Sequence, residues 1–167
     1  MSEESVLRAS AAAHPSALDF SVAAINHIGV TVEDLEAAMA FWTGFLQVDP
    51  LWHLYLDAPY LSSITGYPKL AIEACMIPLP GGVFLELLEY QTSGKASNDM
   101  GTANPGNVHI CFEVSDVDAA WSRAVALGAR SRSPETGTIS SGPNMGNRAC
   151  YLRIHDDVTI EIVTRKN

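Results

Sequence analysis

Basic residues are scarce in this sequence and form no cluster. Only 10 of the 167 residues are Lys or Arg, against 19 Asp and Glu, which gives a formal net charge of −9 at pH 7. Nucleic acids and anionic membranes attract basic surfaces, so an acidic chain without a basic cluster is a poor candidate for binding either. We therefore expect a small-molecule substrate as the partner, with no nucleic acid and no membrane.

Long apolar runs and paired cysteines are also missing. No stretch approaches the roughly 18 apolar residues of a membrane-spanning helix. Residues 1–24 lack the basic start and apolar core of a signal peptide. The three cysteines include no Cys-x-x-Cys pair, which fits free thiols in a reducing compartment. These absences predict a cytoplasmic protein.

The most informative feature that is present is an internal repeat. Residues 25–38 match residues 107–120 at an offset of 82 (109 − 27), with His, Ile, Val, Asp and an Ala-Ala pair at the same places. Residues 73–88 match residues 148–163 at an offset of 75 (161 − 86). The first copy therefore carries seven extra residues, which we place within residues 55–69 because Pro and Gly gather there.

Each copy has the same order of predicted elements. A short β-rich run precedes a helix with apolar residues at helical spacing, and further strands follow. The predicted strands cover 25–32, 51–56, 70–77 and 82–90, then 108–114, 130–133, 148–154 and 158–164; the helices cover 34–46 and 116–127. The sequence thus predicts an α+β fold of two tandem βαβββ modules. We assign 1–23 to an N-terminal tail, 24–91 to the first module, 92–106 to a linker and 107–165 to the second module.

Two His and two Glu recur at matching places in these strands. His27 and His109 lie on the first strand of each module, and Glu86 and Glu161 lie between apolar residues on the last strand. Charged groups in central strands are costly unless they are paired or bind a metal. Inert strand residues are the alternative, but the same pattern occurring twice favours a metal site. Two imidazoles and two carboxylates suit one divalent ion, whether Zn, Co, Ni, Mn or Fe.

Four motifs carry a family resemblance that spans residues 24–165. They are Asn-His-Ile-Gly-Val (26–30), Leu-Glu-Leu-Leu-Glu (85–89), Val-His-Ile (108–110) and Thr-Ile-Glu-Ile (159–162). With them the sequence resembles the vicinal oxygen chelate superfamily of glyoxalase I, methylmalonyl-CoA epimerase, extradiol dioxygenases and antibiotic-resistance proteins. The resemblance implies a homodimer and a mixed sheet that curls into a cup around a metal. The ligands that it implies are His27, Glu86, His109 and Glu161. Glu89 is excluded, because its strand parity puts it on the other face.

The resemblance also implies a chemistry. Members bind two neighbouring substrate oxygens on the metal, which favours an epimerase or isomerase that removes a proton next to a metal-bound carbonyl. Residues 71–76 look like the strand of methylmalonyl-CoA epimerase that carries an acid/base glutamate, which makes Glu73 a candidate catalytic residue. Glu161, acting also as a ligand, and Glu113, on the face of His109, are the other candidates. A solvent-facing Glu73 paired with its repeat partner Arg148 is the alternative.

Substrate and reaction stay open at this point. The chain shows no cationic cluster for the phosphates of coenzyme A, so a neutral hydroxy-ketone or polyol ketone suits its charge better. A glyoxalase I-like lyase, a ring-cleaving dioxygenase and a non-catalytic drug-binding resistance protein are the alternative functions. No cofactor other than the metal ion is expected.

Overall fold

The first half of the chain forms a mixed four-stranded sheet. The computed structural model describes residues 21–92, 96 and 99–164. The first sheet has the order β1-β4-β3-β2, and only the β1–β4 pair is parallel. Its strands are β1 (His27–Thr31), β2 (Trp52–Leu56), β3 (Ala71–Pro78) and β4 (Phe84–Gln91).

The second half repeats this arrangement. Its sheet has the order β5-β9-β8-β6, and β5 is parallel to β9. The short β7 pairs with the first two residues of β8. The strands are β5 (His109–Val114), β6 (Arg130–Ser131), β7 (Gly137–Thr138), β8 (Arg148–Arg153) and β9 (Thr159–Thr164). The predicted α+β fold is therefore confirmed. The single curled cup is not, because the described strands form two sheets with no ladder between β1 and β5.

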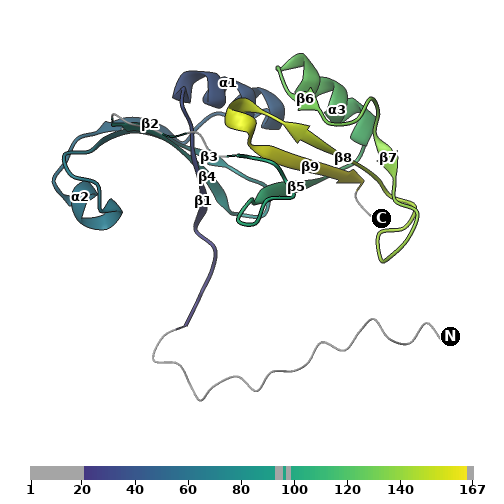
Figure 1. Cartoon of the computed structure of the whole chain (residues 1–167), viewed down its shortest axis with the longest axis horizontal. Helices are drawn as coiled ribbons and strands as arrows, with labels where there is room; N and C mark the ends of the chain where they lie inside the picture. The colour runs from purple at the N-terminus through teal and green to yellow at the C-terminus, as the bar shows by residue number, and fades with distance from the viewer. Residues whose placement is uncertain (1–20, 93–95, 97–98, 165–167) are drawn as a thin grey trace.

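One helix covers one face of each sheet. Helix α1 (Leu35–Leu46) begins where Asp34 accepts a hydrogen bond from the backbone N–H of Ala37, and α3 (Val117–Ala126) begins in the same way at Asp116. Such side-chain caps satisfy backbone N–H groups that have no partner within the helix. Figure 1 shows α1 and α3 on the same side of the two sheets. The short helix α2 (Tyr60–Thr65) lies within the predicted insertion, and the 3₁₀ turn η1 (His155–Asp157) connects β8 to β9.

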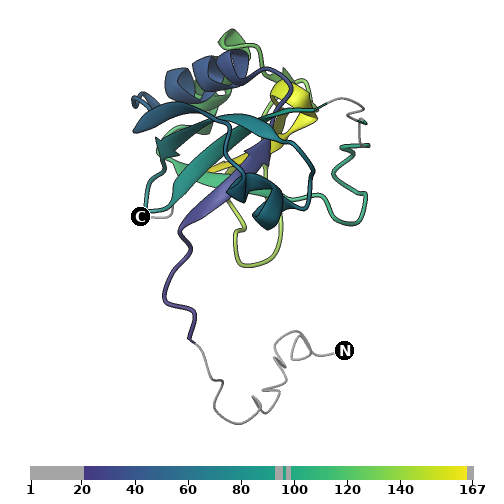
Figure 2. The same cartoon turned by 90° about the vertical axis from the view of Figure 1, so that its left-hand side faces the viewer.

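The two modules share one hydrophobic core. Trp42 of α1 is fully buried and contacts Phe112 of the second sheet, and its indole N–H donates to Nε2 of His155 at 2.8 Å. Arg123 of α3 donates through Nε to the backbone carbonyl of Gly44 in α1, at 2.8 Å. Turned by 90°, the same view keeps both helices at the top of the molecule, over the strands (Figure 2). Helix α1 therefore packs on both sheets and holds the modules together.

The predicted tail (1–23) and linker (92–106) fall partly outside the described residues, so the module boundaries stay predictions. The homodimer and the cytoplasmic location also stay predictions. Within the described part of the chain, no helix combines the length and the hydrophobicity that crossing a membrane requires.

Because of the contact between Trp42 and His155, we expect the stability of the protein to depend on pH. Burial lowers the pKa of His155, whose Nε2 accepts the indole hydrogen bond and so carries no proton. In the unfolded chain this imidazole titrates near its ordinary value, about 6.5. Below that pH the unfolded chain binds more protons than the folded one, so the free energy of unfolding decreases as the pH falls.

Urea unfolding measured between pH 7.5 and 5.0 checks this expectation. In H155Q the amide can accept the same hydrogen bond but does not titrate, so its stability should fall less over this range. Equal slopes for the two proteins would contradict the assignment of His155 as a neutral buried acceptor.

Candidate metal centre

The first predicted ligand pair forms within the first sheet. In the parallel β1–β4 pair Gly29 lies opposite Glu86, so the side chains of His27 and Glu86 share a face. Nε2 of His27 lies 3.3 Å from Oε2 of Glu86, and both side chains are partly exposed. Nδ1 of His27 contacts Oδ1 of Asn26 at 2.8 Å.

The second pair repeats this geometry in the second sheet. Cys111 lies opposite Glu161 in the parallel β5–β9 pair, so His109 and Glu161 share a face. Nε2 of His109 lies 3.1 Å from Oε2 of Glu161. The exposed side-chain fractions are 39% and 20%, against 40% and 21% for His27 and Glu86. The two modules thus present equivalent and equally accessible His/Glu pairs.

Both pairs lie on the sheet faces that α1 and α3 leave open; on this face of the first sheet, Leu61 of α2 packs with Ile72 and Ala74. The alternate residues of β1, β4, β5 and β9 point to the helices and form the core, among them Leu85, Leu87, Ile160 and Ile162. Because α1 and α3 lie on the same side of the two sheets, both open faces point to the other side (Figure 1). The fold therefore puts all four predicted ligands on one side of the molecule.

The donor set fits a divalent metal ion. The contact of Nδ1 with Oδ1 of Asn26 orients the ring of His27 so that Nε2 faces a carboxylate oxygen of Glu86. Two electron-pair donors at 3.3 Å repel unless a proton or a cation lies between them. A hydrogen bond to the second ring nitrogen is also how metal-binding His side chains are oriented. Imidazole nitrogen with carboxylate oxygen is a common ligand set for Zn²⁺ and its neighbours.

The four predicted ligands form two separate His/Glu pairs, one in each sheet. Among the described residues, the group whose ligand atoms all lie within 4.8 Å of one another is a different one, made of Glu36, His53 and Glu73. Nε2 of His53 lies 2.9 Å from Glu73, and its Nδ1 lies 3.8 Å from Glu36. Any test of metal binding has to distinguish this Glu36/His53/Glu73 group from the two His/Glu pairs.

The position of Glu73 disagrees with its predicted catalytic role. In the β3–β4 pair Glu73 lies opposite Glu89 and Met76 lies opposite Glu86, so Glu73 and Glu86 point to opposite faces. Glu73 faces the side of α1 and pairs with His53. A base beside the metal would have to share the face of the ligands, so this placement separates Glu73 from the predicted reaction centre.

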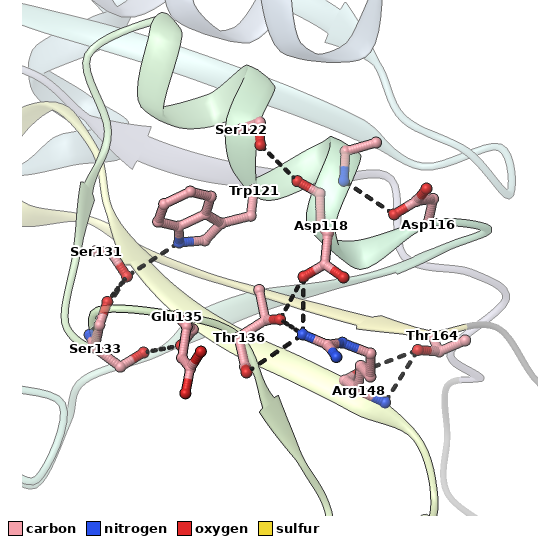
Figure 3. A network of polar contacts seen from close by, with 11 residues as sticks. Asp116, Asp118, Trp121, Ser122, Ser131, Ser133, Glu135, Thr136, Arg148 and Thr164 are labelled. Atoms are coloured by element: carbon pink, nitrogen blue, oxygen red, sulfur yellow. Dashed lines mark hydrogen bonds and ion pairs between the residues drawn. The ribbon is translucent and has the colours of Figure 1, made fainter.

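The repeat partner of Glu73 occupies the equivalent place in the second module. Arg148 of β8 forms an ion pair with Asp118 of α3 at 2.9 Å and donates to Thr136, as Figure 3 shows. Asp118 is itself the repeat partner of Glu36 (118 − 36 = 82). The alternative pairing of Glu73 with Arg148 is therefore wrong, since each binds a partner within its own module. Glu89 also lies on the helix side, where it accepts from the backbone N–H of Leu35 at 2.9 Å, as its exclusion from the ligands requires.

Glu113 shares the open face with His109 and Cys111. It lies opposite Val163 in the β5–β9 pair, is exposed, and forms no hydrogen bond or ion pair with another described residue. Of the predicted acid/base groups, Glu113 and Glu161 thus lie on the face of the ligands.

Sequence reasoning missed Tyr151. It lies opposite Glu161 in the β8–β9 pair, and its hydroxyl donates to Oε2 of Glu161 at 3.2 Å and lies 3.5 Å from Nε2 of His109. Burial, followed by the charge of Glu161, raises the pKa of Tyr151, so it remains a donor at neutral pH. The sequence did contain a signal for this residue. Its repeat partner is the apolar Met76, so this position diverged between the two modules.

A match to a family model shows to which superfamily the chain belongs. Residues 26–151 match the Glyoxalase/Bleomycin resistance protein/Dioxygenase superfamily. The chain belongs to this superfamily. The matched range includes His27, Glu86 and His109, whereas Glu161 lies beyond its end.

Two relatives in this superfamily are named as epimerases. The chain is 27% identical over 146 residues to a 2-epi-5-epi-valiolone epimerase from Actinomyces sp., covering 84% of this chain and 78% of the relative. It is 32% identical over 108 residues to an ethylmalonyl-CoA/methylmalonyl-CoA epimerase from Cereibacter sphaeroides, covering 64% and 72%. A crystal structure of a glyoxalase family protein from Bacillus cereus has the same fold, with a TM-score of 0.78 at 19% identity over 91% of this chain and 100% of that chain.

The cysteines of this superfamily member should react slowly with thiol reagents. Cys75 and Cys150 are buried, whereas Cys111 is exposed on the open face. Burial, followed by the charge of Glu161, raises the pKa of Cys111 to about 11. Because the thiolate is the reactive form, alkylation of Cys111 at pH 8 should be about a hundredfold slower than that of a free cysteine.

Iodoacetamide labelling of the chelator-treated protein, read by mass spectrometry, checks this expectation. In E161Q the neighbouring charge is gone, so Cys111 should react faster while Cys75 does not change. Labelling of wild-type Cys111 at the rate of free cysteine would contradict the raised pKa.

Proposed function

We propose that this protein is a divalent-metal-dependent epimerase or isomerase of a small carbonyl compound. The observation that carries the proposal is the pair of equivalent His/Glu contacts on the open faces, His27 with Glu86 and His109 with Glu161. The superfamily match and the two epimerase-named relatives support the same reading.

The proposed ligands are His27, Glu86, His109 and Glu161, and the proposed acid/base groups are Glu161 and Glu113. For one ion to bind, a His27/Glu86 pair and a His109/Glu161 pair have to meet, within one chain or between the two chains of the proposed homodimer. A bound divalent ion would supply Lewis acidity toward the carbonyl oxygen and make the neighbouring C–H group more acidic. Epimerisation then needs a carboxylate that takes this proton and an acid that returns one to the other side of the carbon. Tyr151 donates to Oε2 of Glu161 and so holds this carboxylate in place.

Two carboxylates on one open face can divide this work. Glu113 is exposed and has no described partner, so it can exchange protons with water. Glu161 is more enclosed, with a side chain that is 20% exposed and held by His109 and Tyr151. A glyoxalase I-like lyase would need the same proton transfer, so the two enzymatic alternatives share these residues.

Metal content is the first expected outcome. Elemental analysis of the purified protein should find about one divalent ion per chain, and E86Q and H109A should each lose it. The matched control is H53A, which removes the imidazole of the Glu36/His53/Glu73 group and should keep the ion.

The pattern among these variants decides which site binds. Loss of the ion in H53A together with retention in H109A would assign it to the Glu36/His53/Glu73 group and overturn the proposed centre. No ion in the wild-type protein, even after incubation with Zn²⁺, Co²⁺, Ni²⁺, Mn²⁺ or Fe²⁺, would move the function to a ligand-binding module without turnover.

Exchange of a substrate proton with solvent is the second expected outcome. Hydroxy-ketones and α-branched acyl thioesters incubated with the metal-loaded protein in D₂O should gain deuterium at the carbon next to the carbonyl, as followed by NMR. Removing a general base typically lowers the rate by about 10²–10⁴-fold, so E113Q should slow the exchange by this factor while it keeps the metal.

The matched control for this experiment is E73Q. Glu73 lies on the opposite face of its sheet, so its exchange rate should equal that of the wild type. If E73Q slowed the exchange of the substrate proton and E113Q did not, Glu73 would be the catalytic base and the assignment of Glu113 would be wrong.

A further inference from the structure

Three arginines that are distant in the sequence line one cleft of the second module. The cleft is open and has a volume of about 470 Å³. Its charged lining consists of Arg130, Arg132, Arg153, Asp99 and Asp157. Three of the chain's 10 Lys and Arg residues thus gather at one place, where they outnumber the carboxylates although the whole chain is strongly acidic.

Arg153 is the unusual member of this cleft. Only 8% of its surface is exposed, yet no carboxylate of a described residue lies within ion-pair distance of its guanidinium. Among the described residues it donates through Nη1 to the backbone carbonyl of Asp157. The backbone N–H of Gly101 and, to a smaller extent, the charge of Arg153 lower the pKa of Asp99, so Asp99 interacts with Arg153 without forming an ion pair. Removing a charge from water is costly unless an opposite charge compensates it, so a buried guanidinium beside a cleft indicates an anion as the missing partner.

The other two arginines add to this site. Arg130 lies opposite Arg153 in the β6–β8 pair and forms an ion pair with Asp157. Arg132 is exposed and pairs with no carboxylate among the described residues. Planar guanidinium groups bind phosphate and carboxylate oxygens through paired N–H donors.

The cleft lies on the same sheet face as the candidate metal centre. Arg153 lies opposite Thr159 in the β8–β9 pair, and Thr159 lies opposite His109 in the β5–β9 pair. Residues directly opposite one another point to the same face, so Arg130, Arg153, Thr159 and His109 form one row across the sheet. The backbone of Arg153 is therefore two strand spacings, about 10 Å, from that of His109.

We propose that this cleft binds an anionic group, a phosphate or a carboxylate, at the end of the substrate opposite to the reacting carbonyl. This proposal rests on the proposed function for the carbonyl end, whereas the anion site itself stands on the arginines alone. It replaces the expectation of a neutral ketone, which was based on the absence of a cationic cluster from the sequence. The substrate class is thus a carbonyl compound that carries an anionic tail.

Titration calorimetry of the metal-free protein with pyrophosphate at low salt tests the anion site. One anion should bind per chain, and R153Q should weaken binding at least tenfold. R153K keeps the charge without the planar fork and should fall between the two. Thermal unfolding of each variant shows whether the fold is retained, and R153K keeps the test decisive if R153Q does not fold.

The matched control is R148Q. Arg148 lies on the same strand but on the helix-covered face, where it pairs with Asp118 (Figure 3). The same loss of charge at this position should leave the affinity for pyrophosphate unchanged. Absence of binding to the wild type, or equal weakening in R148Q and R153Q, would overturn the site.

A second titration separates a substrate anchor from a site for a free anion. In the metal-loaded protein, dihydroxyacetone phosphate or a longer ketose phosphate should bind more tightly than inorganic phosphate, and the matching neutral ketose should not displace phosphate. H109A should bind ketose phosphates only as tightly as inorganic phosphate, and its affinity for inorganic phosphate should equal that of the wild type. Equal affinities of phosphate and all ketose phosphates would mean a free-anion site and overturn the substrate proposal.

The two proposals can fail separately. A protein that binds pyrophosphate but no metal would keep the anion site and lose the proposed enzyme. A protein that binds metal through His109 but no pyrophosphate would keep the proposed centre and lose the anionic substrate.

Discussion

Burial of one face of each sheet beneath a helix is the constraint on which the rest of the structure depends. Helix α1 covers β3 and β4, and α3 covers β8 and β9. Successive strand residues point to opposite faces, so a polar side chain that alternates with Leu85 and Leu87, or with Ile160 and Ile162, must point to the open face. The positions of Glu86 and Glu161 follow directly from the core.

A second consequence concerns how the modules sit together. Helix α1 packs on its own sheet and, through Trp42, on Phe112 and His155 of the second module. This shared core fixes both helices on one side and both open faces on the other. Because the indole N–H of Trp42 donates to Nε2 of His155, this contact between the modules requires a neutral His155. One contact thus couples the placement of the two His/Glu pairs to the protonation of a residue outside both pairs.

Much of this arrangement could be predicted from the sequence because it depends on local patterns. The repeat gave the order of strands and helices in both modules, and each strong strand was predicted within two residues of its observed ends. Parity along a strand was enough to put His109, Cys111 and Glu113 on one face. It was also enough to separate Glu89 from Glu86.

Relations between strands could not be predicted in this way. Glu73 was predicted as a base because residues 71–76 resemble a strand of methylmalonyl-CoA epimerase, but its face relative to Glu86 depends on the register of β3 against β4, which no single strand reveals. Tyr151 and the Arg130/Arg132/Arg153 cleft depend likewise on the pairing of β8 with β9 and β6. A sequence without a basic run can therefore still form a basic cleft, because antiparallel pairing brings Arg130 next to Arg153.

The remaining question is how a nearly symmetric ligand set could handle an asymmetric substrate. The His/Glu pairs of the two modules have almost the same distances and exposure, so they do not distinguish one end of a carbonyl compound from the other. The difference must come from neighbouring positions on the open face where the repeat has diverged. Tyr151 stands where the first module has Met76, and Arg153 stands where it has Pro78 (153 − 75). In both cases the second module has the hydrogen-bond donor and the first an apolar residue. On the proposed function, the duplicated framework supplies the metal ligands, and these two substitutions give the substrate its direction.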